Sequence, residues 1–376
     1  GQRADYELKL NSYDISVDIE LADVVRRLRF EHPEVRTLVV GSAKDRIFCS
    51  GANIFMLGSS THTFKVNFCK FTNETRLGLE AMAEECGIHT MAALNGTCAG
   101  GGYELALACE EIILQDDGNS TVSLPETPLL AVLPGTGGLT RVVDKRMVRR
   151  DLADVFCTVA EGIKGRRAVE WNLVDRVVPA SRFKEFISSR AVEAAQAEAP
   201  RGRDDGRPGV VLAPLGGSYD ADGVTHRFVT ARQDGRLLEI TLRGPDAAPP
   251  ADAEAARETA NDWWALRAAR ELDDVLLDLR FNRPDIGLVV LRTEGDSDAV
   301  LAHDAFLDAH RDDWFVYEVL ATWKRTLKRL DLTARSFFAL MEAGSCFSGT
   351  LFELALAADR SYMLDDPDHP VAFALS

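Results

Sequence analysis

The stretch Leu94–Ala108, LNGTCAGGGYELALA, decides how this sequence is interpreted. It has the pattern of a buried apolar strand, then a loop with three consecutive glycines, then a helix with apolar spacing. Glycines let the backbone approach a ligand closely, and the start of a helix directs unpaired N–H groups and a positive dipole end outward. Because Glu104 follows in the first turn, the segment predicts a site that stabilises an oxyanion and moves a proton beside it.

Composition sets the broad class of the protein. Its 376 residues, 46% of them hydrophobic, predict two globular domains. The net charge of -16 argues against nucleic acid as a main partner, because phosphate backbones need clustered Lys and Arg. Seven Cys without CxxC spacing predict reduced thiols in a cytoplasmic protein and argue against a zinc or iron–sulfur metal site. No apolar run approaches the ~20 residues that span a bilayer, and Gly1–Asp5 has no signal-peptide pattern, so we expect no membrane partner.

The first half of the chain alternates helical patterns with short apolar strands, which predicts an α/β layer architecture. In the long helical pattern at 63–86, we expect Phe64, Phe68, Phe71, Leu79 and Met82 to form the apolar side. The other segments with clear periodicity are helices at 19–29 and 181–198 and strands at 37–41, 90–94 and 112–114.

The chain also repeats itself at an offset of about 250 residues. The matched pairs are Leu21–Pro33 with Leu272–Pro284, Leu38–Val40 with Leu288–Val290, and Tyr103–Ala108 with Phe352–Ala357. Three matches in the same order predict a tandem duplication. We therefore expect a first domain at 1–198, a linker rich in turn formers at 199–224 and a second domain at 225–376, opened by a hairpin of Thr225–Arg232 with Arg236–Arg243.

The second copy has lost the features that predict chemistry in the first. Gly349-Thr350-Leu351 stands opposite the three glycines, so bulky side chains replace two of them. His303-Asp304-Ala305 stands opposite the region of Ser50–Asn53 and contains no glycine. The chain ends near the position that would match Glu126. We therefore expect a degenerate, structural and truncated second copy, in which Glu353 has no catalytic role.

Four motifs in the first half occur in a characteristic order. They are Phe48-Cys49-Ser50-Gly51-Ala52-Asn53-Ile54, Ala92 through Gly102, Pro125-Glu126, and Leu133-Pro134-Gly135-Thr136-Gly137-Gly138. With this order and spacing, the region from about Glu20 to Pro179 resembles the crotonase, or enoyl-CoA hydratase/isomerase, superfamily. The resemblance implies a spiral of ββα units that binds acyl-CoA thioesters, and an assembly of several copies, a homo-oligomer such as a dimer.

The resemblance also implies roles for particular residues. The two backbone N–H groups that hold the thioester oxygen in this superfamily match Ala52 and Gly101, and its two acid/base carboxylates match Glu104 and Glu126. Contacts to the substrate and its CoA moiety are implied for Ser50, Asn53, Ile54 and Gly100. The superfamily usually has Asp where Asn53 stands. No metal and no cofactor is implied beyond the coenzyme A that the substrate carries.

A narrower resemblance covers Ser50–Gly58 and continues through Phe64–Arg76. These segments are similar to the benzoyl-CoA ring-opening lyases, the 2,3-epoxybenzoyl-CoA dihydrolases, which also carry a second, degenerate crotonase unit. The resemblance implies hydrolytic ring opening of an epoxidised or dihydroxylated benzoyl-CoA to formate and a dehydroadipyl-CoA semialdehyde, a step of aerobic CoA-dependent benzoate degradation.

Two alternatives remain open at this point. A general enoyl-CoA hydratase/isomerase would have the same two Glu residues and glycine loops. A non-catalytic acyl-CoA-binding protein would need the loops but not the acids. The residues leave undecided which Glu acts first as the base.

Overall fold

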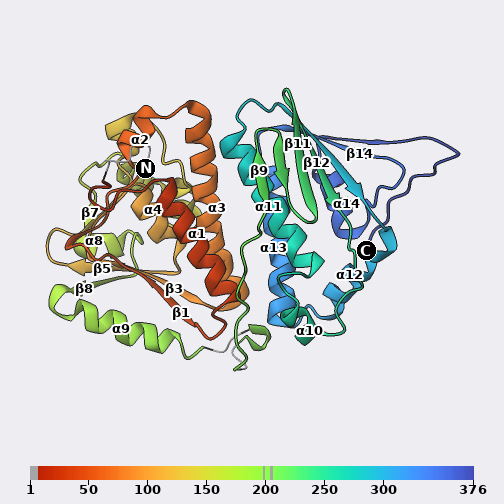
Figure 1. Cartoon of the computed structure of the whole chain (residues 1–376). Helices are drawn as coiled ribbons and strands as arrows, with labels where there is room; N and C mark the ends of the chain where they lie inside the picture. The colour runs from red at the N-terminus through yellow and green to blue at the C-terminus, as the bar shows by residue number, and fades with distance from the viewer. Residues whose placement is uncertain (1–6, 198–199, 204–205) are drawn as a thin grey trace. The chain divides into compact units, whose positions relative to one another are not determined.

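The computed structural model describes residues 7–197, 200–203 and 206–376. The chain divides into two compact units, Gly1–Pro200 and Arg201–Ser376, which are described separately (Figure 1). The expectation for Gly1–Asp5 concerns residues outside the described part, as does the predicted domain end at 198–199.

The first unit alternates strands and helices in the way the sequence predicts. Its helices are α1 (Ile15–Phe30), α2 (Ile54–Ser59), α3 (His62–Cys86), α4 (Gly101–Ala108), α5 (Glu126–Leu130), α6 (Gly138–Thr140), α7 (Arg150–Phe156), α8 (Gly165–Glu170) and α9 (Phe183–Ala194). Its strands are β1 (Thr37–Val40), β2 (Arg46–Cys49), β3 (His89–Leu94), β4 (Gly96–Ala99), β5 (Glu111–Asp116), β6 (Thr121–Ser123), β7 (Ile163–Lys164) and β8 (Arg176–Pro179).

These strands form two four-stranded sheets. The first has the order β1-β3-β5-β8 and is parallel throughout. The second has the order β2-β4-β6-β7, with only the β6–β7 pair antiparallel. Consecutive strands β3 and β4 therefore enter different sheets. Helix α4 follows β4 directly, so it starts at the C-terminal end of an inner strand of the second sheet.

Strand β4 corrects the prediction of a loop between Leu94 and the glycines. A Cβ built on Gly96 would lie 1.9 Å from the carbonyl carbon of Arg46, so only glycine lets this segment approach β2. The short segment Gly96–Ala99 has no alternating apolar pattern, and backbone pairing with β2 and β6 makes it a strand. Two of the three glycines, Gly101 and Gly102, already belong to the helix.

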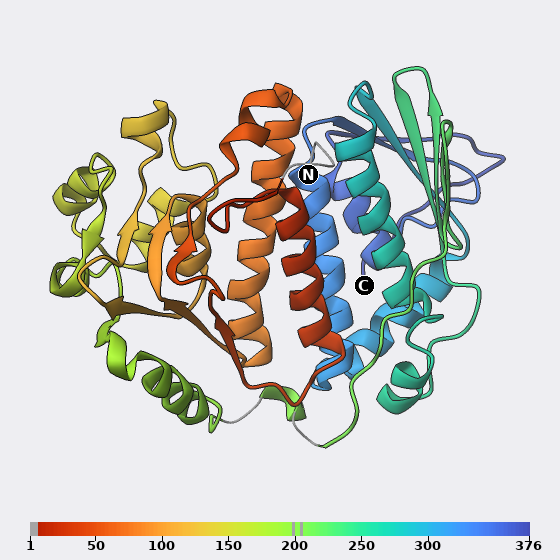
Figure 2. The same ribbon diagram turned by 60° about the vertical axis from the view of Figure 1, so that its left-hand side comes forward.

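Helices α1 and α3 lie side by side on one face of the unit (Figure 2). The side chain of Thr61 accepts the N–H of Phe64 and starts α3, and Gly87, with φ 64°, ends it in a left-handed conformation. Four of the five residues expected on its apolar side are buried, and Phe64 is half-buried. The predicted helix is therefore confirmed.

The second unit is built around one seven-stranded sheet. Its strands are β9 (Ser218–Asp220), β10 (Gly223–Thr225), β11 (Val229–Asp234), β12 (Leu237–Arg243), β13 (Leu288–Glu294), β14 (Ser336–Met341) and β15 (Arg360–Met363). Its helices are α10 (Ala253–Glu258), α11 (Trp264–Asn282), α12 (Ser297–Ala309), α13 (Trp314–Asp331) and α14 (Gly349–Ala357). Strands β9 to β12 form an antiparallel meander, and β12 to β15 are parallel.

The predicted hairpin is confirmed, because β11 and β12 pair antiparallel across the expected turn. Its first strand starts later than predicted, and the predicted linker needs correction. Strand β9 and part of β10 lie inside 199–224. Gly223 lets β10 approach β11 closely, since a Cβ there would lie 1.9 Å from the Ala231 oxygen. The predicted strand Thr225–Arg232 is interrupted after Thr225. There the N–H groups of Phe228 and Val229 donate to the buried carboxylate of Glu271, at 2.7 and 3.1 Å, instead of to a strand.

The seven cysteines are all thiols, as their spacing predicts. Burial raises the pKa of the Cys109 thiol to about 12 and the pKa of Cys98 well above its usual value. These two thiols are therefore uncharged and weakly reactive at neutral pH. Among the described residues, no helix combines the length and the apolar character needed to cross a bilayer.

Candidate active site

The three glycines at the start of α4 have separate structural roles. Gly100 has φ 52° and ψ -127°, a conformation that side chains rarely adopt. A Cβ on Gly102 would lie 2.6 Å from the carbonyl oxygen of Cys49, so only glycine fits there. Gly101 is the first residue of the helix, and no side chain caps this end. Its amide is therefore one of the donors that a helix start leaves without an intrahelical partner.

A second amide faces the same place from the loop before α2. Tyr13 and Ala52 form a parallel bridge, in which Tyr13 donates its N–H to Gly51 (2.8 Å) and accepts the N–H of Asn53 (2.7 Å). In an extended segment the N–H of the residue between these two groups points the other way. The N–H of Ala52 is therefore directed away from Tyr13. A Cβ built on Gly101 would lie 3.5 Å from the Ala52 nitrogen, so the two segments meet here.

Glu104 lies in the first turn of α4, as predicted, and its side chain is buried. Its Oε1 accepts the backbone N–H groups of Thr136 (3.0 Å) and Gly138 (2.9 Å), and its Oε2 accepts the hydroxyl of Thr136. A Cβ on Gly138 would lie 2.9 Å from Oε1, which explains the glycine at this position. The loop 134–138 therefore fixes the orientation of this carboxylate.

That loop is held in turn by an ion pair. Arg141 donates to the Thr136 carbonyl (3.1 Å) and to both oxygens of Glu80 (2.9 and 2.8 Å), and Lys145 also donates to Glu80 (3.0 Å). Burial alone would raise the pKa of the Glu80 carboxyl, but these two cations lower it below its usual value. A charged Glu80 thus anchors Arg141 beside the loop that binds Glu104.

Glu126 lies at the first position of α5, directly after Pro125. Its carboxyl packs against Gly100, since a Cβ there would lie 2.6 Å from Oε1. Burial, and then the negative charge of Glu104, raises the pKa of Glu126 to about 7. Within the described residues its buried Oε2 has no hydrogen-bond partner. A half-buried carboxyl that has one buried, unpaired oxygen and is close to half-protonated at neutral pH is suited to proton transfer.

The residues expected to contact the substrate lie around these groups but differ in exposure. Gly100 is buried, Ser50 is half-buried, and Ile54 is 64% exposed. The buried side chain of Asn53 caps α2, with Oδ1 accepting the N–H groups of Phe55 (3.1 Å) and Met56 (3.3 Å). An amide oxygen serves this purpose as well as a carboxylate, so Asn can replace the usual Asp at this position.

Comparison with known proteins identifies the family. Residues 7–201 match the family described as enoyl-CoA hydratase/isomerase. The chain belongs to the enoyl-CoA hydratase/isomerase family. Its first unit has the crotonase-like α/β fold, and the four motifs picked out in the sequence are the segments that bring Ala52, Gly101, Glu104 and Glu126 together.

One curated relative extends over both units. The chain is 58% identical over 367 residues to the benzoyl-CoA-dihydrodiol lyase of Aromatoleum evansii, a match that covers 97% of this chain. It spans 66% of that relative's length.

Two solved structures are similar to part of the chain. An enoyl-CoA hydratase of Geobacillus kaustophilus HTA426 is 33% identical, with 51% of this chain and 69% of that chain covered and a TM-score of 0.46. An enoyl-CoA hydratase of Bacillus anthracis is 26% identical, with 52% and 72% covered and a TM-score of 0.46.

One residue at this family site was missed by the sequence analysis. Arg76 on α3 is completely buried and donates to the carbonyl oxygen of Gly101 at 2.9 Å. The missed signal is positional: Arg76 follows Phe68 and Thr72 at intervals of four residues and precedes Leu79 by three, so it lies on the buried stripe of the helix.

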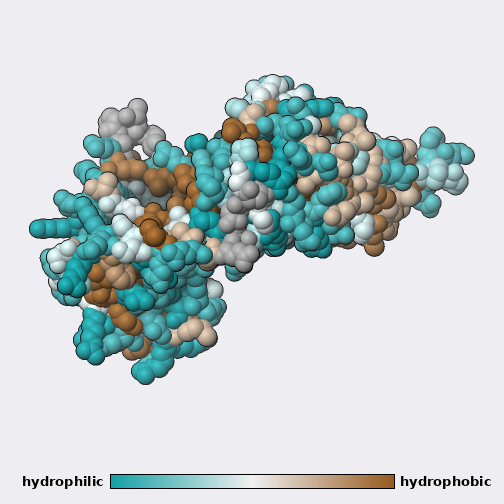
Figure 3. All heavy atoms as spheres, turned by 90° about the horizontal axis from the view of Figure 1, so that it is seen from below, coloured by the Kyte–Doolittle hydropathy of each residue, from teal (hydrophilic) through white to brown (hydrophobic). Residues whose placement is uncertain are grey.

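Hydrophobic residues are also exposed on the first unit. In the space-filling view of Figure 3 they gather around a hollow on the left-hand part of the molecule, which is the first unit. The exposed apolar residues next to the site segments are Ile54, Phe55, Leu129, Leu130, Val132 and Leu133.

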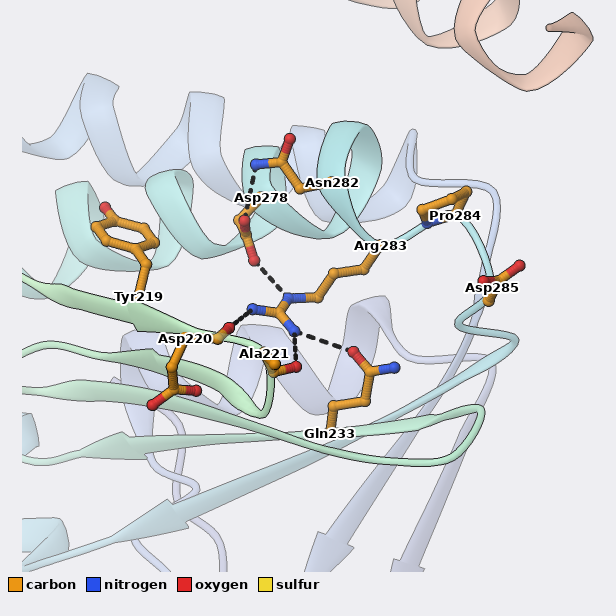
Figure 4. A pocket seen from close by; sticks show the side chains of 9 residues that line it. All are labelled: Tyr219, Asp220, Ala221, Gln233, Asp278, Asn282, Arg283, Pro284 and Asp285. Carbon is orange, nitrogen blue, oxygen red and sulfur yellow. Dashed lines mark hydrogen bonds and ion pairs between the residues drawn. The ribbon is translucent and has the colours of Figure 1, made fainter.

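A pocket of about 330 Å³ in the second unit does not have the character of an active site (Figure 4). Arg283 extends across it and binds mainly to the protein itself. Its guanidinium donates to Asp278 (2.6 Å), to Gln233 (3.0 Å) and to the carbonyl oxygens of Asp220 and Ala221 (both 3.2 Å). Four of the five N–H donors of the cation are therefore used by the protein itself.

Proposed function

We propose that the protein opens the ring of an epoxidised or dihydroxylated benzoyl-CoA by hydrolysis, giving formate and a dehydroadipyl-CoA semialdehyde. The observation that carries the proposal is the arrangement at the start of α4, where the amides of Ala52 and Gly101 meet beside the carboxyls of Glu104 and Glu126. The similarity to the Aromatoleum evansii protein supports this choice of substrate over other CoA thioesters.

Two amides at one point suit the thioester. Ring opening next to the thioester builds negative charge on its carbonyl oxygen, and donors that are already in place stabilise that charge without reorganising. The Gly101 donor also lies at the positive end of the α4 dipole. The site is thus suited to any reaction that passes through a thioester enolate.

The two carboxyls are suited to different roles. Three donors converge on Glu104 and fix the orientation of its side chain, so we assign Glu104 the role of base that activates water. Glu126, with its pKa raised to about 7, can carry a proton at neutral pH, and we assign it the role of acid that protonates the ring oxygen. Two neighbouring acids whose environments differ in this way can divide the work of a hydrolysis.

The reaction as proposed is redox-neutral. Two water molecules enter for each epoxide opened, or one for each dihydrodiol, and the carbon lost leaves as formate. Since no electrons are exchanged, proton donors and acceptors are the only groups the balance requires. We therefore propose that the coenzyme A of the substrate is the one cofactor moiety involved.

The decisive assay compares two substrates. Incubated with 2,3-epoxybenzoyl-CoA, the protein should release one formate for each thioester consumed, and with crotonyl-CoA it should show little hydration. Fast crotonyl-CoA hydration without formate would identify a general enoyl-CoA hydratase/isomerase. Tight binding of both thioesters without turnover would identify a binding protein. Because the relative is longer than this chain, the assay should be run on this chain and on the full-length protein.

We further propose that the second unit is a degenerate copy of the first. The order of its elements supports this: α11, β13, α13, β14, α14 and β15 follow one another as α1, β1, α3, β3, α4 and β5 do. In each unit the three strands are parallel neighbours in the same order. The corresponding helix pairs, α1 with α3 and α11 with α13, also pack against each other.

The start of α14 explains why this copy would bind no thioester. Thr350 stands at the position of Gly101, and its N–H donates to the carboxylate of Asp304 at 2.7 Å, while its hydroxyl donates to the same group at 2.6 Å. The N–H of Gly349 donates to the carbonyl of Ala374 at 2.8 Å. The chain's own oxygens thus occupy the donors that a substrate oxygen would need.

Two further properties are proposed from the surface and the thiols. The exposed apolar side chains beside the site, Leu129, Leu130, Val132 and Leu133, support a homo-oligomer in which another copy covers them. Sedimentation velocity of the full-length protein should therefore give more than the monomer mass, and a monomer at micromolar concentration would contradict this. The seven thiols support a cytoplasmic location.

A further inference from the structure

The first unit contains a fully buried positive charge that the proposed chemistry does not use. Arg76, in the middle of α3, has no exposed surface. Removing a guanidinium from water costs several kcal/mol unless its charge and its donors are matched. A hydrophobic residue at this position would pack without that free-energy cost. The contacts of Arg76 must therefore offset the cost of burying its charge.

The charge is matched by a carboxylate from the neighbouring helix. Asp18 on α1 is completely buried, and its Oδ1 lies 3.6 Å from Nη1 of Arg76. The hydroxyls of Tyr13 and Thr72 both donate to Asp18. Arg76 donates to the Tyr13 oxygen at 3.2 Å, and its guanidinium lies 4.8 Å from the centre of the Tyr13 ring. These four residues are called the Arg76 cluster below.

One member of the Arg76 cluster contacts the first of the two proposed oxyanion donors. Nη2 of Arg76 donates to the carbonyl oxygen of Gly101 at 2.9 Å. This bond fixes the peptide plane that follows the Gly101 amide. It joins α3 to the first turn of α4 at the residue whose N–H is proposed to bind the thioester oxygen.

Another member of the Arg76 cluster contacts the segment that carries the second donor. The backbone of Tyr13 bonds to Gly51 and to Asn53, the neighbours of Ala52 on either side. The phenol of the same Tyr13 is bonded to Asp18 and to Arg76. A single buried cluster therefore holds both amide-bearing segments, which are 49 positions apart in the sequence.

We propose that Arg76, through its pair with Asp18, is a positioning residue that sets the separation of the Ala52 and Gly101 amides. The inference rests on the proposed thioester site, and it adds the group that keeps the two donors aimed at one oxygen. It explains why an ion pair, and not an apolar contact, stands here: the guanidinium reaches a backbone carbonyl and a phenol at the same time, with fixed directions.

The same two helices supply a matched control. Arg29 on α1 is 2% exposed and pairs with Glu85 on α3 at 3.0 Å, with a longer bond to the sulfur of Cys86. This pair lies near the C-terminal ends of both helices, and Arg29 follows Asp18 by about 16 Å along α1. Arg29→Met should therefore remove a buried ion pair between α1 and α3 and leave the amides in place.

The test compares Arg76→Met, Arg76→Lys and Arg29→Met in the whole chain. The first readout is the carbonyl stretch of bound benzoyl-CoA labelled with ¹³C at the thioester, which measures how strongly the two amides polarise it. The second is kcat and KM for whichever CoA thioester the wild-type chain turns over. Melting temperatures report the structural cost of each substitution.

We expect Arg76→Met to lose most of the carbonyl shift and to lower kcat by about 100-fold, as a misplacement of about 1 Å can do, with a much smaller change in KM. Arg76→Lys keeps a charged donor that can reach the Gly101 carbonyl. It should recover part of the carbonyl shift and part of kcat. Arg29→Met should lower the melting temperature and keep the wild-type carbonyl shift and kcat. A folded Arg76→Met chain with the wild-type carbonyl shift and kcat would overturn the inference.

A milder variant covers the case in which Arg76→Met does not fold. Tyr13→Phe removes the phenol that links Asp18 to Arg76 and keeps the ring and the backbone bonds to 51–53. It should reduce the carbonyl shift and lower kcat about tenfold, whereas wild-type values for both would overturn the inference. The spectroscopic probe does not react, so failure of the formate assay alone would refute the proposed reaction and leave this inference standing.

Discussion

Replacing either proposed acid/base residue with its amide is expected to abolish most formate release. Glu104→Gln and Glu126→Gln should each lower kcat by about 10²- to 10⁴-fold, the usual contribution of a positioned proton-transfer group. Binding of benzoyl-CoA should stay within a few-fold of the wild-type value, because the amides that hold the thioester are unchanged. Steady-state kinetics with epoxidised benzoyl-CoA and equilibrium binding of benzoyl-CoA measure the two quantities.

Both substitutions should preserve the fold. In Glu104→Gln the new amide oxygen can still accept the N–H groups of Thr136 and Gly138, and the Thr136 hydroxyl can turn to accept from the new NH₂. Glu353→Gln is the matched control, since Glu353 aligns with Glu104 in the second unit and is exposed on α14. It should keep full activity. Wild-type kcat in both Glu104→Gln and Glu126→Gln would contradict the assignment of the acids.

The pH dependence of the same enzymes separates the roles of the two carboxyls. Because the pKa of Glu126 is raised to about 7, this group is protonated below neutral pH and ionised above it. If Glu126 donates the proton, kcat falls as pH rises through about 7. The pH profile of Glu126→Gln should lack this decrease in kcat. A kcat that instead falls as pH drops through this pKa would make Glu126 the base.

The second large effect is expected from removing one oxyanion donor without changing a catalytic side chain. Ala52→Pro deletes the N–H of residue 52, and the bridge to Tyr13 does not use that group, since it is made by Gly51 and Asn53. Ala52 is also not among the residues with a positive φ, a conformation that proline could not adopt. We expect kcat to fall by at least about 10²- to 10³-fold, as for loss of one donor in other oxyanion sites.

The melting temperature and a second variant, Ala52→Ser, separate the loss of the N–H group from damage to the fold. The melting temperature of Ala52→Pro should stay close to that of the wild type, because no backbone bond of the fold is lost. Ala52→Ser keeps the N–H and should retain at least about tenfold more activity than Ala52→Pro. Equal activity of the two variants would mean that this amide does not stabilise the transition state.

The sequence predicted those parts of the site that depend on local pattern. The helix that carries Glu104 follows from its apolar spacing after the glycines, and α3 follows from its Phe, Leu and Met positions. The pairing of Glu104 with the loop 134–138 could not be read locally, because it depends on how two distant segments meet. The family motifs supplied that information indirectly, through their order.

The errors occurred where backbone approach, and not side-chain pattern, decides the structure. Strands β4 and β10 pair with their neighbours because Gly96 and Gly223 let two backbones come closer than any side chain allows. The role of Arg76 was missed for a different reason. A charged residue is normally assigned to solvent, and its burial here is possible only because Asp18 and Tyr13 arrive from another part of the chain.

The most direct test of this account is a crystal structure of the full-length protein with benzoyl-CoA bound. We expect the thioester oxygen within hydrogen-bond distance of the nitrogens of both Ala52 and Gly101, with the aryl ring between the carboxyls of Glu104 and Glu126. A thioester oxygen bonded to neither amide, or a ring that lies away from both acids, would contradict it.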